Sequence, residues 1–142
     1  MKPEEVGTLV RLRLEQARVA LGDAEYLLEG NRSPASVLNR AYYAMFYAVL
    51  ALLQRRGTVP SKHTGVIALF DKEYVMKGIF SRELSKDLHK AFELRQVSDY
   101  KIVESSSPEE AREIWTKAVR FVEAVQAYLE APAGTPDSNV PA

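Results

Sequence analysis

Residues 39–53 read Asn-Arg-Ala-Tyr-Tyr-Ala-Met-Phe-Tyr-Ala-Val-Leu-Ala-Leu-Leu, and this stretch decides the fold. It contains no glycine or proline and is apolar at almost every position after Arg40, so it predicts a helix that is apolar almost all round. Such a helix must be buried on most sides, and the other helices are expected to pack around it. Because an unpaired arginine is costly to bury, Arg40 either extends its charged end to solvent or forms half of a polar site.

Helix signals on both sides of this stretch frame the predicted bundle. Over residues 3–28 the apolar side chains recur at alternating spacings of four and three, which predicts a helix packed lengthwise on another: Val10, Leu14, Ala17, Leu21, Ala24 and Leu28. Gly30 is expected to end this helix in the left-handed conformation. Ser33 and Pro34 then resemble an N-cap followed by proline at the first helical position, so a second helix is predicted from there to about Arg56.

The second half of the chain predicts three further helices. The first is short and covers residues 61–76, the next begins after Ser81, and the last begins at Ser107 with a cap, a proline and two glutamates. Residues 98–106 are expected to form an irregular polar connection. Residues 132–142 show no periodicity and are expected to be a disordered tail.

No segment alternates with period two over a useful length, so strands are not expected. The prediction is an all-α protein, an antiparallel bundle of four to five helices with up-down topology and one short extra helix, forming a single domain over residues 1–131. The chain has 142 residues, which is a typical length for one domain.

The composition limits the functions that the chain can have. Lys plus Arg and Asp plus Glu both number 19, so no overall charge attracts a polyanion, and a nucleic-acid contact would need a local patch. The chain has no cysteine, which excludes disulfides, thiolate zinc sites and cysteine nucleophiles. We find no signal-peptide core and no stretch expected to span a membrane, so a cytoplasmic location is predicted.

Two arginines are expected to face the core. Arg40, Tyr43 and Tyr47 share one helix face by their spacing of three and then four residues. Arg95 lies eleven residues after the apolar Leu84, almost three whole turns, and therefore on the same face of its helix; Asp99 is within pairing distance of it. The alternatives are a tyrosine-rich core with paired arginines, or guanidinium groups that present rigid, permanent charge to a phosphate.

Lys62 and His63 form the other candidate site, at the start of the third helix, where free backbone N–H groups favour an anion. A histidine in such a place is also often a local cap or a surface residue. The other histidine, His89, falls off the apolar stripe of its helix. The sequence shows no metal-ligand spacing, phosphate-binding glycine loop or nucleophile motif, so no metal site and no cofactor is predicted.

Three segments together resemble the HEPN-domain family: residues 39–48, then Lys-His-Thr-Gly-Val at 62–66, then Phe-Glu-Leu-Arg-Gln-Val-Ser-Asp-Tyr at 92–100. The similarity runs from about residue 8 to 130 and is closest to a prokaryotic branch whose last motif is an arginine followed by Asp-Tyr. It implies a bundle that is usually a homodimer and is often encoded beside a small nucleotidyltransferase with which it forms a complex. Many such pairs act as toxin and antitoxin.

The resemblance also suggests chemistry for particular residues. Nuclease members of the family cleave RNA without metal, using an arginine followed after four to six residues by a histidine. Arg95 matches the arginine, but Tyr100, Lys101 and Ile102 stand where the histidine is expected, so ribonuclease activity would need His63 or Tyr100 to handle protons. In some related toxins a tyrosine near this place accepts adenylyl groups, which makes Tyr100 a candidate.

Three hypotheses therefore remain. In the first, the protein is a nucleotide- or RNA-binding partner of a nucleotidyltransferase, with Arg40, Lys62 and Arg95 binding phosphate. Tyr43, Tyr47, Asp99 and Tyr100 then line the cleft. In the second, it is a metal-independent endoribonuclease toxin with Arg95 and His63 as catalytic residues. In the third, it is an oligomerisation scaffold that binds nothing, in which Arg40 and Arg95 pair with Asp99.

Overall fold

The computed structural model describes the backbone of residues 1–100 and 106–131, and the side chains of residues 98–100 lie outside that description. The described part is helical, without β-strands, as predicted. Its elements are, in order, α1 (Pro3–Glu29), α2 (Pro34–Arg56), α3 (His63–Phe70), the π-helical turn η1 (Asp71–Val75), α4 (Arg82–Tyr100) and α5 (Pro108–Leu129). The predicted tail, residues 132–142, lies outside the described residues.

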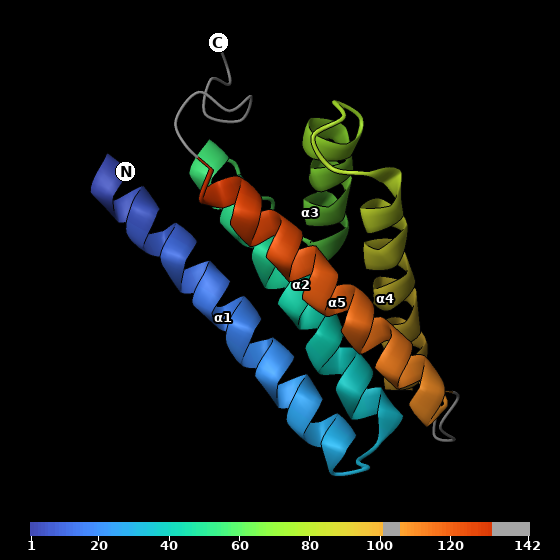
Figure 1. Cartoon of the computed structure of the whole chain (residues 1–142). Coiled ribbons are helices and arrows are strands. Elements are labelled where there is room, and N and C mark those ends of the chain that lie inside the picture. Colours follow the sequence, from blue (N-terminus) through green and yellow to red (C-terminus); the bar gives the residue numbers. More distant parts are fainter. Residues whose placement is uncertain (101–105, 132–142) are drawn as a thin grey trace.

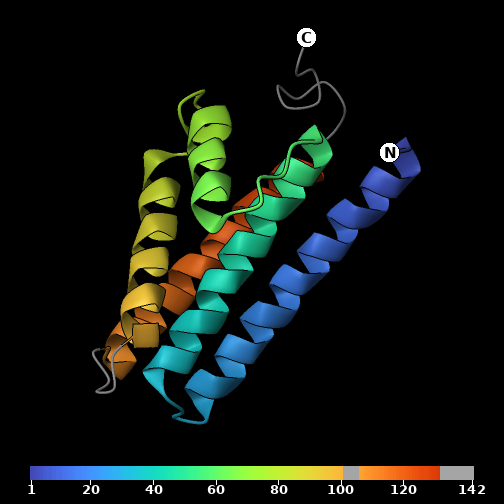
Figure 2. The same cartoon turned by 180° about the vertical axis from the view of Figure 1, so that it is seen from behind.

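Helix α2 occupies the middle of the bundle. It contacts α1, α3, α4 and α5, so most of the other elements pack directly against it. Figures 1 and 2 show α1 along one edge, α2 and α5 side by side in the centre, and α3 and α4 at the opposite edge. The predicted all-α bundle with one short extra helix is therefore confirmed, with α3 as the short helix.

The burial of α2 follows from its composition. Thirteen of its 23 residues are buried, in a nearly continuous run between Val37 and Leu53. Among the described residues, α2 is also the one helix long and apolar enough to cross a membrane, but 72% of its apolar window is buried by the rest of the bundle. Its apolar surface faces protein, as in the core helix of a globular domain.

Most predicted helix ends are confirmed, and two details were wrong. Ser107 Oγ accepts a hydrogen bond from the Glu110 backbone N–H at 3.0 Å, which is the predicted N-cap of α5. After α1, however, Gly30 has a φ of −83°, and the left-handed residue is Asn31 with a φ of 53°. Asparagine tolerates this conformation better than most residues do. In addition, α4 continues to Tyr100, although an irregular connection was predicted from residue 98.

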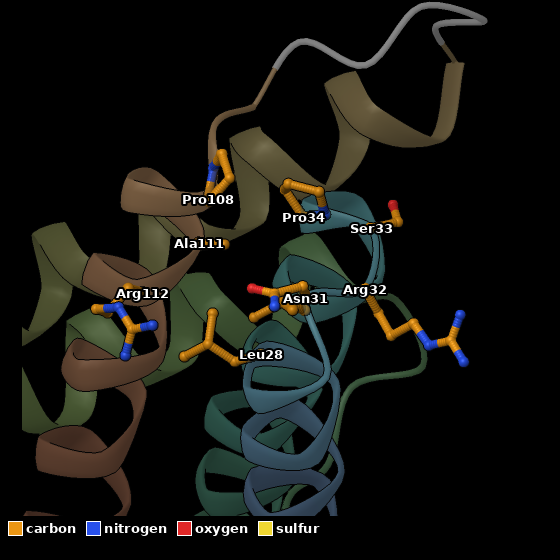
Figure 3. Close-up of a pocket in the computed structure, with 9 residues that line it drawn as sticks. Leu28, Asn31, Arg32, Ser33, Pro34, Pro108, Ala111 and Arg112 are labelled. Atoms are coloured by element: carbon orange, nitrogen blue, oxygen red, sulfur yellow. The ribbon is translucent and has the colours of Figure 1, made fainter.

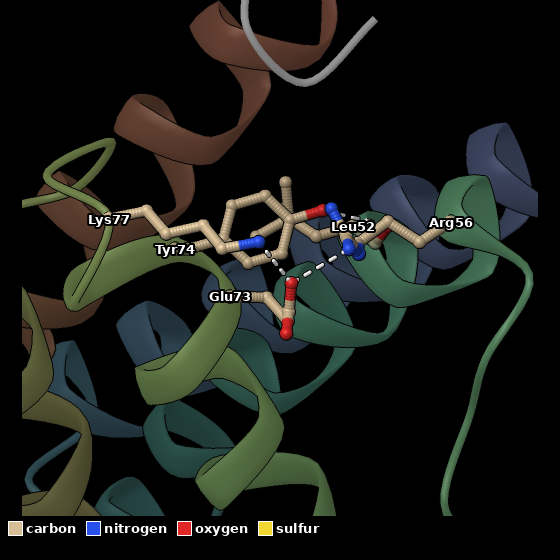
Figure 4. Close-up of polar contacts among 5 residues, drawn as sticks. All are labelled: Leu52, Arg56, Glu73, Tyr74 and Lys77. Carbon is tan, nitrogen blue, oxygen red and sulfur yellow. Dashed lines mark hydrogen bonds and ion pairs between the residues drawn. The ribbon is translucent and has the colours of Figure 1, made fainter. Parts of the chain in front are cut away.

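Two polar contacts attach the α3–η1 segment to the end of α2 (Figure 4). Glu73 Oε1 accepts hydrogen bonds from Arg56 Nη2 at 2.8 Å and from Lys77 Nζ at 2.6 Å. The buried Tyr74 hydroxyl donates to the carbonyl oxygen of Leu52 at 3.3 Å. Since His63 is the first residue of α3, these contacts hold the segment that positions His63.

Replacing Glu73 with glutamine should destabilise the fold in a pH-dependent manner. The pKa of Glu73 is lowered, first by the hydrogen bond from Lys77 and further by the charges of Lys77 and Arg56. A carboxyl group whose pKa is lowered by folding stabilises the protein above its ordinary pKa, and this contribution is lost as the pH falls through the lowered pKa. We therefore expect Glu73→Gln to melt at a lower temperature at pH 7, with a difference that shrinks from about pH 5 downward.

Circular dichroism melts across this pH range measure the effect. Glu113→Gln is the matched control, because Glu113 also pairs with a lysine four residues away, Lys117 at 3.2 Å, on the surface of α5. It should lower the melting temperature less than Glu73→Gln does. A Glu73→Gln protein with the same melting temperature as the wild type at pH 7 would contradict the assigned role of this carboxylate.

Candidate phosphate-binding site

Two guanidinium groups lie close to the ring of Tyr43. The Cζ atom of Arg40 is 5.4 Å from the ring centroid, and that of Arg95 is 5.2 Å from it. Arg40 lies one turn before Tyr43 on α2, whereas Arg95 comes from α4, so the site joins two helices. At these distances each guanidinium is attracted by the electrons of the ring. Two permanent positive charges are thus gathered at one aromatic side chain.

Arg40 is only partly neutralised by its neighbours. It forms an ion pair with Asp23 of α1 at 3.9 Å, and the two side chains are 32% and 51% exposed. An ion pair with this exposure is screened by solvent and contributes little. Arg40 also lines an open groove of about 450 Å³ together with Leu27, Ala35, Ser36 and Asn39. Its charge is therefore accessible from solvent.

His63 is brought to the same tyrosines from α3. Its ring stacks on Phe46 with 4.0 Å between centroids, and its Nδ1 is 2.8 Å from the hydroxyl oxygen of Tyr42. The Tyr43 ring centroid is 5.8 Å from that of His63, and Arg95 Cζ lies 5.6 Å from the Tyr42 ring centroid. His63 and Arg95 therefore contact the same pair of tyrosine rings.

The surroundings of these groups shift their proton affinities in known directions. Burial lowers the pKa of His63, and the positive charge of Arg95 lowers it further. Burial raises the pKa of the Tyr42 hydroxyl well above its ordinary value, although the charge of Arg95 acts in the opposite direction. At neutral pH the site therefore contains a neutral imidazole, a neutral phenol and two guanidinium cations.

Most of the residues proposed from the sequence lie in this place. Arg40, Tyr43, Arg95 and His63 are connected by the contacts above, and Tyr47 packs on Tyr43 with 5.8 Å between ring centroids. The side chain of Lys62 is exposed, and this residue occupies the N-cap position of α3. The side chains of Asp99 and Tyr100 lie outside the described residues, so their proposed roles stay predictions.

Three residues of the site were missed from the sequence. Tyr42 is hydrogen-bonded to His63, Phe46 stacks on the His63 ring, and Asp23 is the ion-pair partner of Arg40. The spacing of Tyr42 and Phe46 places them on one face of α2, but nothing in the sequence shows that His63 packs on that face. Asp23 gives no local signal, because its partner is on another helix.

This arrangement is suited to binding a phosphate group. Guanidinium groups form paired hydrogen bonds to phosphate oxygens, and the aromatic rings offer flat surfaces for a base. In residues 1–97 and 106–131, no cluster of three or more His, Asp or Glu side chains is arranged to hold a metal ion. The described residues of the candidate site offer positive charge, aromatic surface and the imidazole of His63.

A second, smaller pocket lies where the turn between α1 and α2 meets the start of α5 (Figure 3). It has a volume of about 160 Å³. The Asn31 side chain lies toward Arg112 across the pocket in this view, whereas the Arg32 side chain extends away from it. None of the candidate residues named above lines this pocket, so Arg112 offers a comparison for the arginines at Tyr43.

Comparison with known proteins identifies the family. Residues 10–128 match the model of the HEPN domain. A "UPF0332 protein" of Thermotoga maritima is 39% identical over 115 residues, which cover 81% of this chain and 86% of that protein. Two proteins of Methanocaldococcus jannaschii, each named "Putative toxin", are 33% and 32% identical, covering 82% and 89% of this chain and 78% and 90% of their own lengths. The chain therefore belongs to the HEPN-domain family.

Proposed function

We propose that this HEPN protein binds RNA or a nucleotide through a phosphate group held by Arg40 and Arg95. The observation that carries the proposal is the position of the two guanidinium groups, each within 5.4 Å of the centre of the Tyr43 ring. A phosphate group that contacts both guanidinium groups is attracted by two permanent positive charges. The chain has a formal net charge of zero, so this local pair of charges supplies the attraction that the whole molecule lacks.

We further propose that the protein is the toxin-like member of a two-component system in the cytoplasm. Two of its relatives carry the name "Putative toxin", and its HEPN motifs suggest a small nucleotidyltransferase as partner and a homodimeric state. Co-expression with a nucleotidyltransferase encoded beside it, followed by purification on a tag, tests the partnership. Light scattering on the purified chain tests the dimer. A monomer that retains no such partner would remove both proposals.

Substitution of either arginine should weaken binding to single-stranded RNA. We expect Arg40→Gln and Arg95→Gln each to raise the Kd about tenfold or more and to reduce the salt dependence of binding by about one phosphate contact. Fluorescence anisotropy with a labelled single-stranded RNA oligonucleotide at several salt concentrations measures both effects. Competition with unlabelled AMP distinguishes nucleotide binding from binding of the RNA chain.

Arg112→Gln is the matched control, since Arg112 is an exposed arginine that lines the pocket of Figure 3. It should bind RNA like the wild type. Loss of binding in Arg112→Gln, with both other variants unaffected, would move the site to that pocket. If neither RNA nor nucleotides change the melting temperature of the wild type, this result would instead support a scaffold that binds no ligand.

A second candidate function, metal-independent RNA cleavage, is favoured by one observation: His63 contacts the same tyrosine rings as Arg95. If the protein is a ribonuclease, Arg95→Gln and His63→Ala should each reduce cleavage in the presence of EDTA by about a hundredfold or more. His89→Ala is the control, because His89 is half exposed and contacts Asp71 at 2.7 Å instead of the tyrosine rings of the candidate site. Full cleavage by both Arg95→Gln and His63→Ala would eliminate a ribonuclease that uses these two residues.

A further inference from the structure

The contact between Tyr42 and His63 is buried on the tyrosine side. Tyr42 is 0% exposed, and its hydroxyl oxygen lies 2.8 Å from His63 Nδ1. Stacking on Phe46 fixes the plane of the imidazole ring. In the described part of the chain, this is the hydrogen bond that the Tyr42 hydroxyl makes, and the residue is shielded from bulk solvent.

The position of the proton in this hydrogen bond follows from its surroundings. If Nδ1 carried the proton and donated to the phenol oxygen, the phenol O–H would be left as a buried donor without an acceptor, which is costly. If the phenol donates to Nδ1, both groups are satisfied. The neutral imidazole then carries its proton on the other ring nitrogen, Nε2.

We propose that Tyr42 is a positioning residue that fixes neutral His63 in the tautomer with its proton on Nε2, so that His63 donates a hydrogen bond to a phosphate oxygen of the ligand. This inference rests on the proposed function for the identity of the ligand. It assigns His63 the role of a donor beside Arg95. In this tautomer Nε2 neither accepts a proton nor binds a metal ion, and Nδ1 is occupied by Tyr42.

The charges around His63 agree with a neutral ring. Arg95 approaches from α4, the phenols of Tyr42 and Tyr43 face it from α2, and Lys62 precedes it in the chain. The charge of Arg95 and burial both lower the pKa of His63. Protonation would also place a hydrogen on Nδ1 toward the Tyr42 hydroxyl, which would have to turn and leave its own hydrogen unpaired.

Long-range ¹H–¹⁵N correlation spectra of the imidazole rings at pH 7.5 test the tautomer without any ligand. The chain has two histidines, so a His89→Gln variant completes the assignment. We expect His63 Nδ1 to show the shift of an unprotonated nitrogen and Nε2 that of a protonated one, and we expect Tyr42→Phe to produce a mixture of tautomers. A wild-type spectrum with the proton on Nδ1, or one identical to that of Tyr42→Phe, would overturn the proposal.

Two substitutions of His63 test the donor role separately. Glutamine can place an amide N–H near the position of Nε2, whereas asparagine can place one only near Nδ1. We expect His63→Gln to keep the Kd for the single-stranded RNA oligonucleotide within about threefold of wild type and His63→Asn to raise it about tenfold, the effect of one hydrogen bond to a charged group. Equal losses in both variants would overturn the donor role.

The two measurements separate the possible failures. A wild type that shows the predicted tautomer but binds neither RNA nor AMP would reject the proposed function and leave the role of Tyr42 intact. A wild type that binds RNA but has its proton on Nδ1 would do the reverse. Circular dichroism melts show whether Tyr42→Phe folds. If this variant does not fold, the wild-type spectrum tests the tautomer and the His63 variants test the donor role.

Discussion

The structure depends on the need to bury α2 on nearly every side. Between Val37 and Leu53 this helix presents apolar or aromatic side chains around almost its whole circumference, and a single neighbouring helix would cover only one strip of it. Helices α1, α3, α4 and α5 all contact it. Their amphipathic stripes therefore pack on the same partner, which explains why five helices of different length form one bundle around a helix that resembles a membrane segment in composition.

The candidate site is located where this burial ends. Tyr42 is fully buried, whereas Tyr43 and Arg40 are only partly buried, so the site begins at the boundary between the core and solvent. Aromatic rings at such a boundary accept a cation on their electron-rich surface without requiring a buried carboxylate. Arg40 thus sits against the core and keeps much of its charge accessible to solvent, which a fully buried ion pair would not allow.

The sequence predicted the helices well because their signals are local. Apolar periodicity, Ser-Pro and Ser-Pro-Glu-Glu helix starts, and the spacing of Arg40, Tyr43 and Tyr47 all operate within a few turns of one helix. The contacts that complete the site are not local. Tyr42 meets His63 across 21 positions in the chain, and Arg40 meets Asp23 between two helices. Such pairs depend on how helices pack, and single-sequence patterns do not specify the rotation of one helix about another.

Buried Asp87 is a further example of a contact that sequence patterns did not reveal, and it bears on Arg95. Asp87 is 4% exposed and lies 3.7 Å from both Lys117 and Arg120 of α5. Burial raises its pKa, and the two cations oppose that effect. A buried ion pair of this kind contributes little net stability, because desolvation offsets most of the attraction. What the Asp87 contact does instead is fix the position of α4 relative to α5.

Asp87 ties α4 to α5, and Glu73 ties η1 to Arg56 at the end of α2. Arg95 is carried by α4, and His63 by the α3–η1 segment, so each of these site residues comes from an element that charged side chains attach to a neighbouring element. The hydrophobic effect that buries these elements is non-directional, so it specifies their position less sharply than paired charges do. The two carboxylates favour arrangements in which they stay paired, because an unpaired buried carboxylate is costly, and in the observed arrangement Arg95 and His63 lie at the tyrosines of α2.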